Sequence, residues 1–128
     1  MPKKCRCAPL PAAGDGDVLV LWERFRRLRL DFIALPADIC ATAEEESYWR
    51  QALAEDDLMA APARTLPELV VKLRWQAARA SELAVIERAV LDGRPVDLDA
   101  FTCPRDREGW QVVQEAARMS LSKLQDDT

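Results

Sequence analysis

The most informative absence in this chain of 128 residues is histidine, which does not occur once. Histidine is the commonest metal ligand in proteins and the side chain most often used to move protons near neutral pH. Its absence excludes Ser-His and Cys-His nucleophile pairs, HExxH zinc sites and the Glu-x-x-His motifs of di-iron helical bundles. Carboxylate, lysine, tyrosine or thiol chemistry remains. The sequence therefore predicts a protein that is not an enzyme and binds no cofactor.

Glycine-rich phosphate loops and long apolar runs are also missing. The chain has four glycines, and they form neither a GxGxxG nor a GxxxxGK[ST] motif. The chain contains no run of about 18 apolar residues, which is the length that a transmembrane helix requires. The first residues carry two lysines but no apolar segment typical of a secretory signal. We therefore expect a cytoplasmic protein without a membrane anchor.

The composition favours helices over strands. Hydrophobic residues make up 49% of the chain and are dominated by Ala and Leu, while most of the eight prolines lie between apolar periodic stretches. A chain of this length buries enough surface to fold as one domain without a metal or disulfide. We predict an all-α fold, a small bundle of about four helices over residues 17–124, preceded by a flexible tail over residues 1–16.

The clearest helix start is a capping box at Thr65 and Glu68. The Thr65 hydroxyl is expected to accept a hydrogen bond from the third helical amide, while the Glu68 carboxylate reaches back to the amide of Thr65. The pattern predicts a helix over 66–92 that ends at Gly93. We expect this helix to be continuous, although Ser81 is an alternative cap for a separate second segment.

Three further helices follow from the same start signals and apolar spacing. They are predicted over 18–34 after Asp17, over 43–60 after a capping box at Thr42 and Glu45, and over 107–124 after Asp106. The connector from Val96 to Pro104 is expected to include one helical turn at 98–101, whose apolar side chains pack into the core. The predicted buried faces include Trp49, Leu53 and Met59 in 43–60, and Trp110, Val113, Leu121 and Leu124 in 107–124.

Four tryptophans are many for a chain of this length. Trp22, Trp49 and Trp110 coincide with apolar stripes, so we expect them in the core. Trp75 lies with Val71 off the main apolar face of its helix, and two interpretations stay open. The strip either packs against a further helix or is exposed and marks a partner surface, since aromatic residues and Arg are enriched at interface centres. That predicted partner surface consists of Val71, Arg74, Trp75 and Arg79.

Charge is distributed unevenly along the chain. The net charge is −4, but residues 1–30 carry +4 and the remainder carries −8. One interpretation is that the first helix has a solvated basic face that pairs with acidic groups of the same fold. The other is a patch that contacts phosphates of a nucleic acid. Its predicted contacts are Arg24, Arg26, Arg27 and Arg29.

The four cysteines allow three interpretations. Cys5, Cys7, Cys40 and Cys103 could form a four-thiolate zinc site, but zinc sites usually contain two C-x2-C pairs and this chain has none. A disulfide is disfavoured if the compartment is reducing. We therefore predict independent thiols and no metal, with Cys40 and Cys103 half-buried in connectors and Cys5 and Cys7 in the tail.

Several short motifs together resemble a known group of proteins. They are Leu21-Trp22-Glu23-Arg24, the acidic Glu44-Glu45-Glu46 stretch with Trp49, and Pro62-Ala63-Arg64-Thr65-Leu66 leading into Val71-Lys72-Leu73-Arg74. Over about residues 18–75 the chain resembles short helical proteins of unknown function from bacteria and prophages. The resemblance implies a bacterial, soluble, all-helical protein and carries over no catalytic or binding residue.

Two functions follow as expectations. The first is a small protein interaction or accessory module, with an unknown protein partner or a second copy of the chain on the surface around Trp75. The alternative is a nucleic-acid-associated regulator that uses the basic first helix, which the acidic charge of the whole chain disfavours.

Overall fold

The computed structural model describes the backbone of residues 17–126 and the side chains of residues 17–121, and the regular elements in this part of the chain are all helices. The elements are α1 (Val18–Ile33), α2 (Ala41–Ala60), α3 (Leu66–Ser81), α4 (Ala84–Leu91), the short 3₁₀ helix η1 (Leu98–Ala100) and α5 (Pro104–Asp126). The all-α prediction is confirmed, with five α-helices in place of about four. The tail predicted over 1–16 lies outside the described residues. No helix within 17–126 is long and apolar enough to cross a membrane.

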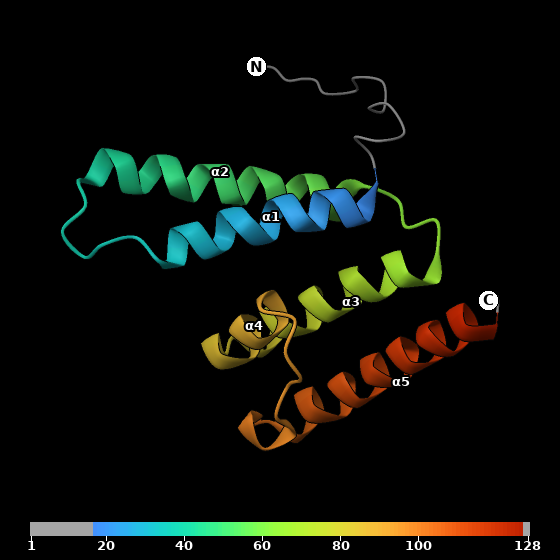
Figure 1. The fold of residues 1–128 in the computed structure, drawn as a ribbon. Coiled ribbons are helices and arrows are strands. Elements are labelled where there is room, and N and C mark those ends of the chain that lie inside the picture. Colours follow the sequence, from blue (N-terminus) through green and yellow to red (C-terminus); the bar gives the residue numbers. More distant parts are fainter. Residues whose placement is uncertain (1–16, 127–128) are drawn as a thin grey trace. The chain divides into compact units, whose positions relative to one another are not determined.

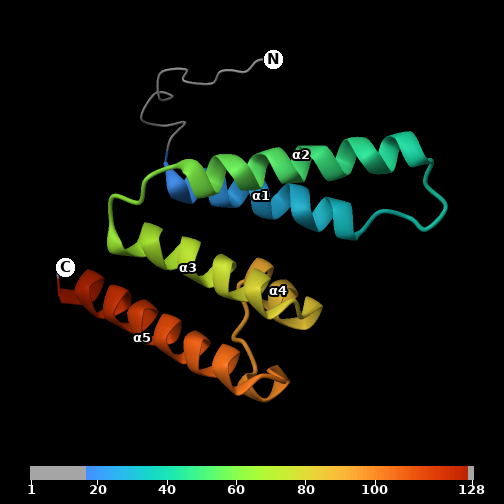
Figure 2. The same ribbon diagram turned by 180° about the vertical axis from the view of Figure 1, so that it is seen from behind.

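One helical domain was predicted over 17–124. The chain divides into two compact units, with the boundary between Ala61 and Pro62. In the first unit α1 and α2 pack side by side as an antiparallel hairpin, which both views show (Figures 1 and 2). In the second unit α3 packs against both α4 and α5, and α5 runs antiparallel to α3.

The first helix begins where the sequence predicts. Asp17 is extended, and its side chain accepts a hydrogen bond of 2.7 Å from the amide of Leu19, which satisfies one of the free donors at the helix start. Val18, Leu21 and Phe25 then form the buried stripe of α1 at helical spacing.

The start predicted for the second helix is wrong. The helix begins at Ala41, and its N-cap Cys40 makes no side-chain cap bond. The Cys40 carbonyl already accepts the amide of Glu44 at 3.1 Å. Thr42 therefore lies inside the first turn, where it cannot act as the N-cap of a capping box.

The buried face predicted for the second helix is wrong as well. Trp49 is 55% exposed and Leu53 is 60% exposed, while the buried stripe consists of Gln51, Ala54 and Leu58. Gln51 belongs to this stripe because its amide is satisfied: it donates to the Tyr48 carbonyl at 3.0 Å and accepts from Arg29 Nη1 at 3.1 Å. Apolar periodicity counts only apolar residues, so it does not predict the burial of a glutamine. Met59, the third of these expected buried residues, is partly exposed.

The capping box at the start of α3 is half confirmed. The Thr65 hydroxyl accepts from the amide of Glu68 at 3.3 Å, as predicted. The Glu68 carboxylate, however, accepts from the amide of Arg64 at 2.6 Å and not from that of Thr65. The cap therefore reaches one residue further back than the standard motif.

The predicted continuous helix over 66–92 is wrong, and the alternative of a separate second segment is confirmed in part. The second segment begins at Ala84 after Leu83, so Ser81 ends α3 and is not the N-cap of α4. The Ser81 hydroxyl donates to the Ala78 carbonyl at 2.6 Å and accepts from the amide of Leu83 at 3.2 Å, so it replaces helical backbone bonds at this point. Glu82 adopts a left-handed conformation with φ of 57°. The break makes α4 a separate helix that folds back on α3, which explains the fifth helix.

The end predicted at Gly93 is confirmed. Gly93 has φ of +72°, its amide donates to the Val90 carbonyl at 3.2 Å, and the amide of Arg94 donates to the Ala89 carbonyl at 2.9 Å. These two bonds form a Schellman motif, which satisfies the last carbonyls of α4 and redirects the chain.

The predicted helical turn after this point is confirmed as η1. Asp97 caps it by accepting from the amide of Asp99 at 2.9 Å. Val96 and Phe101, on either side of η1, are 7% and 5% exposed, so the connector contributes to the core of the second unit.

The last helix begins earlier than predicted. It starts at Pro104, whose fixed φ suits a first helical position, and Asp106 lies in the first turn and is not the cap. Trp110 and Val113 are buried as expected, but Leu121 is 62% exposed. The side chain of Leu124 lies outside the described residues.

The left-handed Glu82 generates a stability prediction. Glu82→Gly should raise the free energy of unfolding by about 0.5–1 kcal/mol, because glycine adopts positive φ without the clash of a Cβ atom. Urea denaturation followed by circular dichroism measures the change. The control Glu115→Gly, in the exposed interior of α5, should lower the same free energy by about 1 kcal/mol. A loss of stability on Glu82→Gly would show that the break is held by contacts of the Glu82 side chain.

Candidate anion-binding pocket

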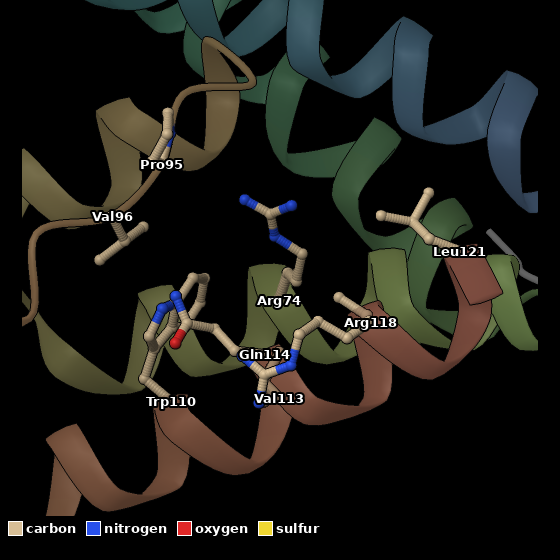
Figure 3. Close-up of a pocket in the computed structure, with 9 residues that line it drawn as sticks. Arg74, Pro95, Val96, Trp110, Val113, Gln114, Arg118 and Leu121 are labelled. Carbon is tan, nitrogen blue, oxygen red and sulfur yellow. The ribbon is translucent and has the colours of Figure 1, made fainter.

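A pocket of about 200 Å³ lies in the second unit between α3, α5 and the segment that follows α4 (Figure 3). One lining residue comes from α3, two come from the segment after α4, and six come from one face of α5 at helical spacing. They are Arg74, Pro95, Val96, Trp110, Val113, Gln114, Ala117, Arg118 and Leu121. The lining is mainly apolar, with a few polar groups that converge on the same space.

Arg74 provides the central charge of the pocket. Its guanidinium carbon lies 5.5 Å from the centroid of the Trp110 ring, a cation–π distance. The side chain stands between the Pro95–Val96 segment and Leu121 (Figure 3). Its Nε is buried and has no hydrogen-bond partner among the described residues. Burial lowers the pKa of Arg74 from its ordinary value, because the charged form has lost hydration that no acidic group replaces.

Trp110 forms the floor beneath this guanidinium. The residue is 1% exposed, and its ring packs tilted against Phe101 with 6.3 Å between centroids. Its indole Nε1 is buried and, within the described part of the chain, lacks an acceptor. A buried indole N–H normally finds a partner. The pocket therefore contains two buried donors that the described residues leave without acceptors, and a buried donor of this kind costs about 1–3 kcal/mol.

Arg118 and Gln114 are the other polar residues that line the pocket. Arg118 is exposed on the same face of α5 and makes no ion pair with a described residue. The Gln114 amide can both donate and accept hydrogen bonds. None of the nine lining residues carries a carboxylate, a hydroxyl or a thiol. This arrangement offers hydrogen bonds and positive charge to an anion, and it provides no nucleophile and no general base.

The predicted partner surface does not form one exposed strip. Trp75 is 1% exposed, so the exposed aromatic anchor that this hypothesis requires is absent. Val71 is half-buried, and Arg79 is exposed with its guanidinium 6.0 Å from the Trp75 ring centroid. Of the four residues, Arg74 alone lines the pocket.

The basic residues of α1 are largely occupied within the first unit. Arg24 forms an ion pair of 2.8 Å with Asp57, and Arg26 forms one of 2.8 Å with Glu23. The structure thus shows the pairing with acidic groups of the fold for these two residues. The other two residues also lie on α1: Arg29 donates to Gln51 and lies over the Phe32 ring, and Arg27 is exposed.

Two of the four cysteines lie in the described part of the chain. Cys40 and Cys103 are free and exposed, so the prediction that they are half-buried is wrong. They belong to different units, while Cys5 and Cys7 lie outside the described residues. Within residues 17–126, no group of three or more Cys, Asp or Glu side chains could hold a metal ion.

The pairing of Arg74 with Trp110 was missed by sequence reasoning, although α5 carries a signal for it. Trp110, Gln114, Arg118 and Leu121 recur at spacings of three or four, so two polar side chains lie within an otherwise apolar stripe. Polar residues within an otherwise apolar helix face are a more specific sign of a binding pocket than an exposed arginine is.

Comparison with protein-family models, curated proteins and solved structures gives no match for this chain. The resemblance to short helical proteins of bacteria and prophages therefore remains a prediction.

The unpartnered donor on Arg74 has a measurable consequence. Arg74→Met should raise the free energy of unfolding by about 1 kcal/mol, because it keeps the packing on Trp110 and removes a half-buried cation that has no acidic partner. Urea denaturation measures the difference. Arg105→Met, at an exposed position of the same α5, should change stability by less than about 0.5 kcal/mol. A clear loss of stability on Arg74→Met would mean that the guanidinium stabilises the free protein.

Proposed function

We propose that this protein is a small, non-catalytic interaction or accessory module that binds a partner protein through the Arg74–Trp110 pocket. The observation that carries the proposal is a pair of buried donors that find no acceptor among the described residues, in a pocket whose described lining residues carry no carboxylate. Binding sites are typically concave and mainly apolar, with a few converging polar groups. An acceptor supplied by a partner would satisfy donors that the described chain leaves unpaired.

The residue types in the pocket support binding over catalysis. Tryptophan and arginine are the side chains that most often dominate the energy of protein interfaces. None of the described lining residues is a side chain that could act as a nucleophile or general base, so we propose binding, without catalysis or a cofactor, as the role of this pocket. The cytoplasmic location and the bacterial or prophage origin belong to the same proposal.

The alternative, a nucleic-acid-associated regulator, is less well supported. It requires Arg24, Arg26, Arg27 and Arg29 to contact phosphates, and the first two already form ion pairs of 2.8 Å with carboxylates. A phosphate would have to displace these exposed pairs, which are themselves weak. No feature of the described residues favours this function over the pocket, so it remains the second hypothesis.

The proposal is tested by affinity isolation with matched variants. Full-length protein is immobilised, exposed to lysate of the cell that naturally produces it, and retained proteins are quantified by mass spectrometry. We expect at least one protein to be retained by the wild type and reduced about tenfold or more by Arg74→Gln, because a hydrogen bond to a charged group is worth about 1.5–3 kcal/mol. A second copy of the chain among these proteins would identify the partner as self.

The control variant is Arg105→Gln, which removes the same charge from an exposed position outside the pocket. It should retain the same proteins as the wild type. Equal retention by wild type, Arg74→Gln and Arg105→Gln would exclude the pocket as the binding site.

A further inference from the structure

The size of the pocket limits what it can hold. Its volume is about 200 Å³, and an apolar cavity of about 150 Å³ is known to bind benzene. A ligand group of about eight non-hydrogen atoms therefore fits, which is small compared with typical drug-sized sites of about 300–1,000 Å³. The pocket suits the end of a molecule better than a nucleotide or a helix.

The lining of the pocket suits a ligand group that has both an apolar part and hydrogen-bond acceptors. Pro95, Val96, Val113, Ala117 and Leu121 present apolar surface, whereas Arg74 and Trp110 present donors. The guanidinium is planar and offers parallel N–H groups, a geometry that matches the two oxygens of a carboxylate. A phosphate dianion would need more donors than this apolar lining supplies, and its burial would cost more.

The open side of the pocket indicates that the ligand continues outward. Leu121 lines the pocket and is 62% exposed, and Arg118 is exposed beside it. An apolar side chain at the rim and an amide group at Gln114 suit a peptide that leaves the pocket along α5, since a peptide carries both side chains and backbone groups. A free small acid would leave this rim unused.

We propose that the pocket binds the C-terminal end of a partner polypeptide, with its free carboxylate on Arg74 and the side chain of its last, aliphatic residue against Val96 and Val113. The inference rests on the proposed function and names the group that the partner presents. Arg118 contributes a second, solvent-screened charge at the rim.

Access to the deepest donor requires a local movement. The indole Nε1 of Trp110 is closed to solvent, and the side chains of the same pocket, among them Gln114, lie around it. A rotation of pocket-lining side chains would have to uncover the indole N–H for a carboxylate oxygen. Side-chain rotations of this kind are common at interfaces whose backbone hardly moves.

Titration calorimetry with defined peptides tests the inference on the full-length protein. The main probe is N-acetyl-Gly-Gly-Leu with a free carboxylate, and the matched probe is the same peptide with a C-terminal amide. We expect the free acid to bind at least tenfold more tightly than the amide, because only the acid pairs with Arg74. Replacing the terminal leucine by glycine should weaken binding by about tenfold or more, since the apolar contact is lost.

Two variants connect this binding to the pocket. Arg74→Gln should weaken binding of the free acid by about 10- to 100-fold, and Arg105→Gln should leave it unchanged. Arg74→Lys keeps the charge without the fork and should fall between wild type and Arg74→Gln. Circular dichroism of each variant establishes that it is folded, and Arg74→Lys carries the test if Arg74→Gln is not.

The remaining outcomes would overturn the inference in distinguishable ways. Equal affinity for 4-methylpentanoate and the peptide acid would assign the pocket to a small free acid, and binding of inorganic phosphate in place of the peptide would assign it to a phosphate. If no probe binds while the affinity isolation still depends on Arg74, the carboxylate inference is wrong and the interaction function stands. If retention is also independent of Arg74, both are wrong.

Discussion

The Arg74 guanidinium of α3 lies over the Trp110 ring of α5, and the properties of the pocket depend on this contact. The ring packs tilted against Phe101, and none of the described lining residues carries a carboxylate that could neutralise the cation. The cation–π contact compensates about 0.5–2 kcal/mol of the lost hydration, which is less than a full ion pair in a buried site would supply. The unpaired donors and the lowered pKa of Arg74 follow from this single imbalance.

The break between α3 and α4 is what allows the pocket to form. The Ser81 hydroxyl hydrogen-bonds to backbone groups at the end of α3, and Glu82 adopts a left-handed backbone conformation that ends the helix. The Schellman motif at Gly93 then changes the chain direction a second time. These two changes of direction bring Pro95 and Val96 back to the side of α3 that carries Arg74. An uninterrupted helix over 66–92 would carry the segment after Gly93 away from Arg74, and the pocket would lack its apolar wall.

Local chemistry was predictable from the sequence, and the site was not. The cap at Asp17, the Thr65 half of the capping box, the end at Gly93 and the turn at 98–101 each depend on a few neighbouring residues. The buried face of α2 was missed because Gln51 is buried through hydrogen bonds that apolar periodicity does not register. Arg74 and Trp110 lie on different helices, so their contact depends on packing that a single sequence does not reveal. The sequence left burial and exposure of Trp75 both open, and the structure shows it buried; Trp110 is buried as expected, but its place at the pocket was not predicted.

Arg74 Nε–H and Trp110 Nε1–H lack an acceptor among the described residues. We propose that a ligand supplies it, and nuclear magnetic resonance can observe both donors. The measurement is the ¹H–¹⁵N spectrum of the full-length protein during addition of N-acetyl-leucine, with the indole signal assigned through Trp110→Phe and the guanidinium signal through Arg74→Lys. We expect the Trp110 Nε1–H and Arg74 Nε–H signals to move together, with one affinity, and N-acetyl-leucine amide to move neither. Unchanged signals at saturating acid, or equal shifts with the amide, would show that these donors do not bind a carboxylate.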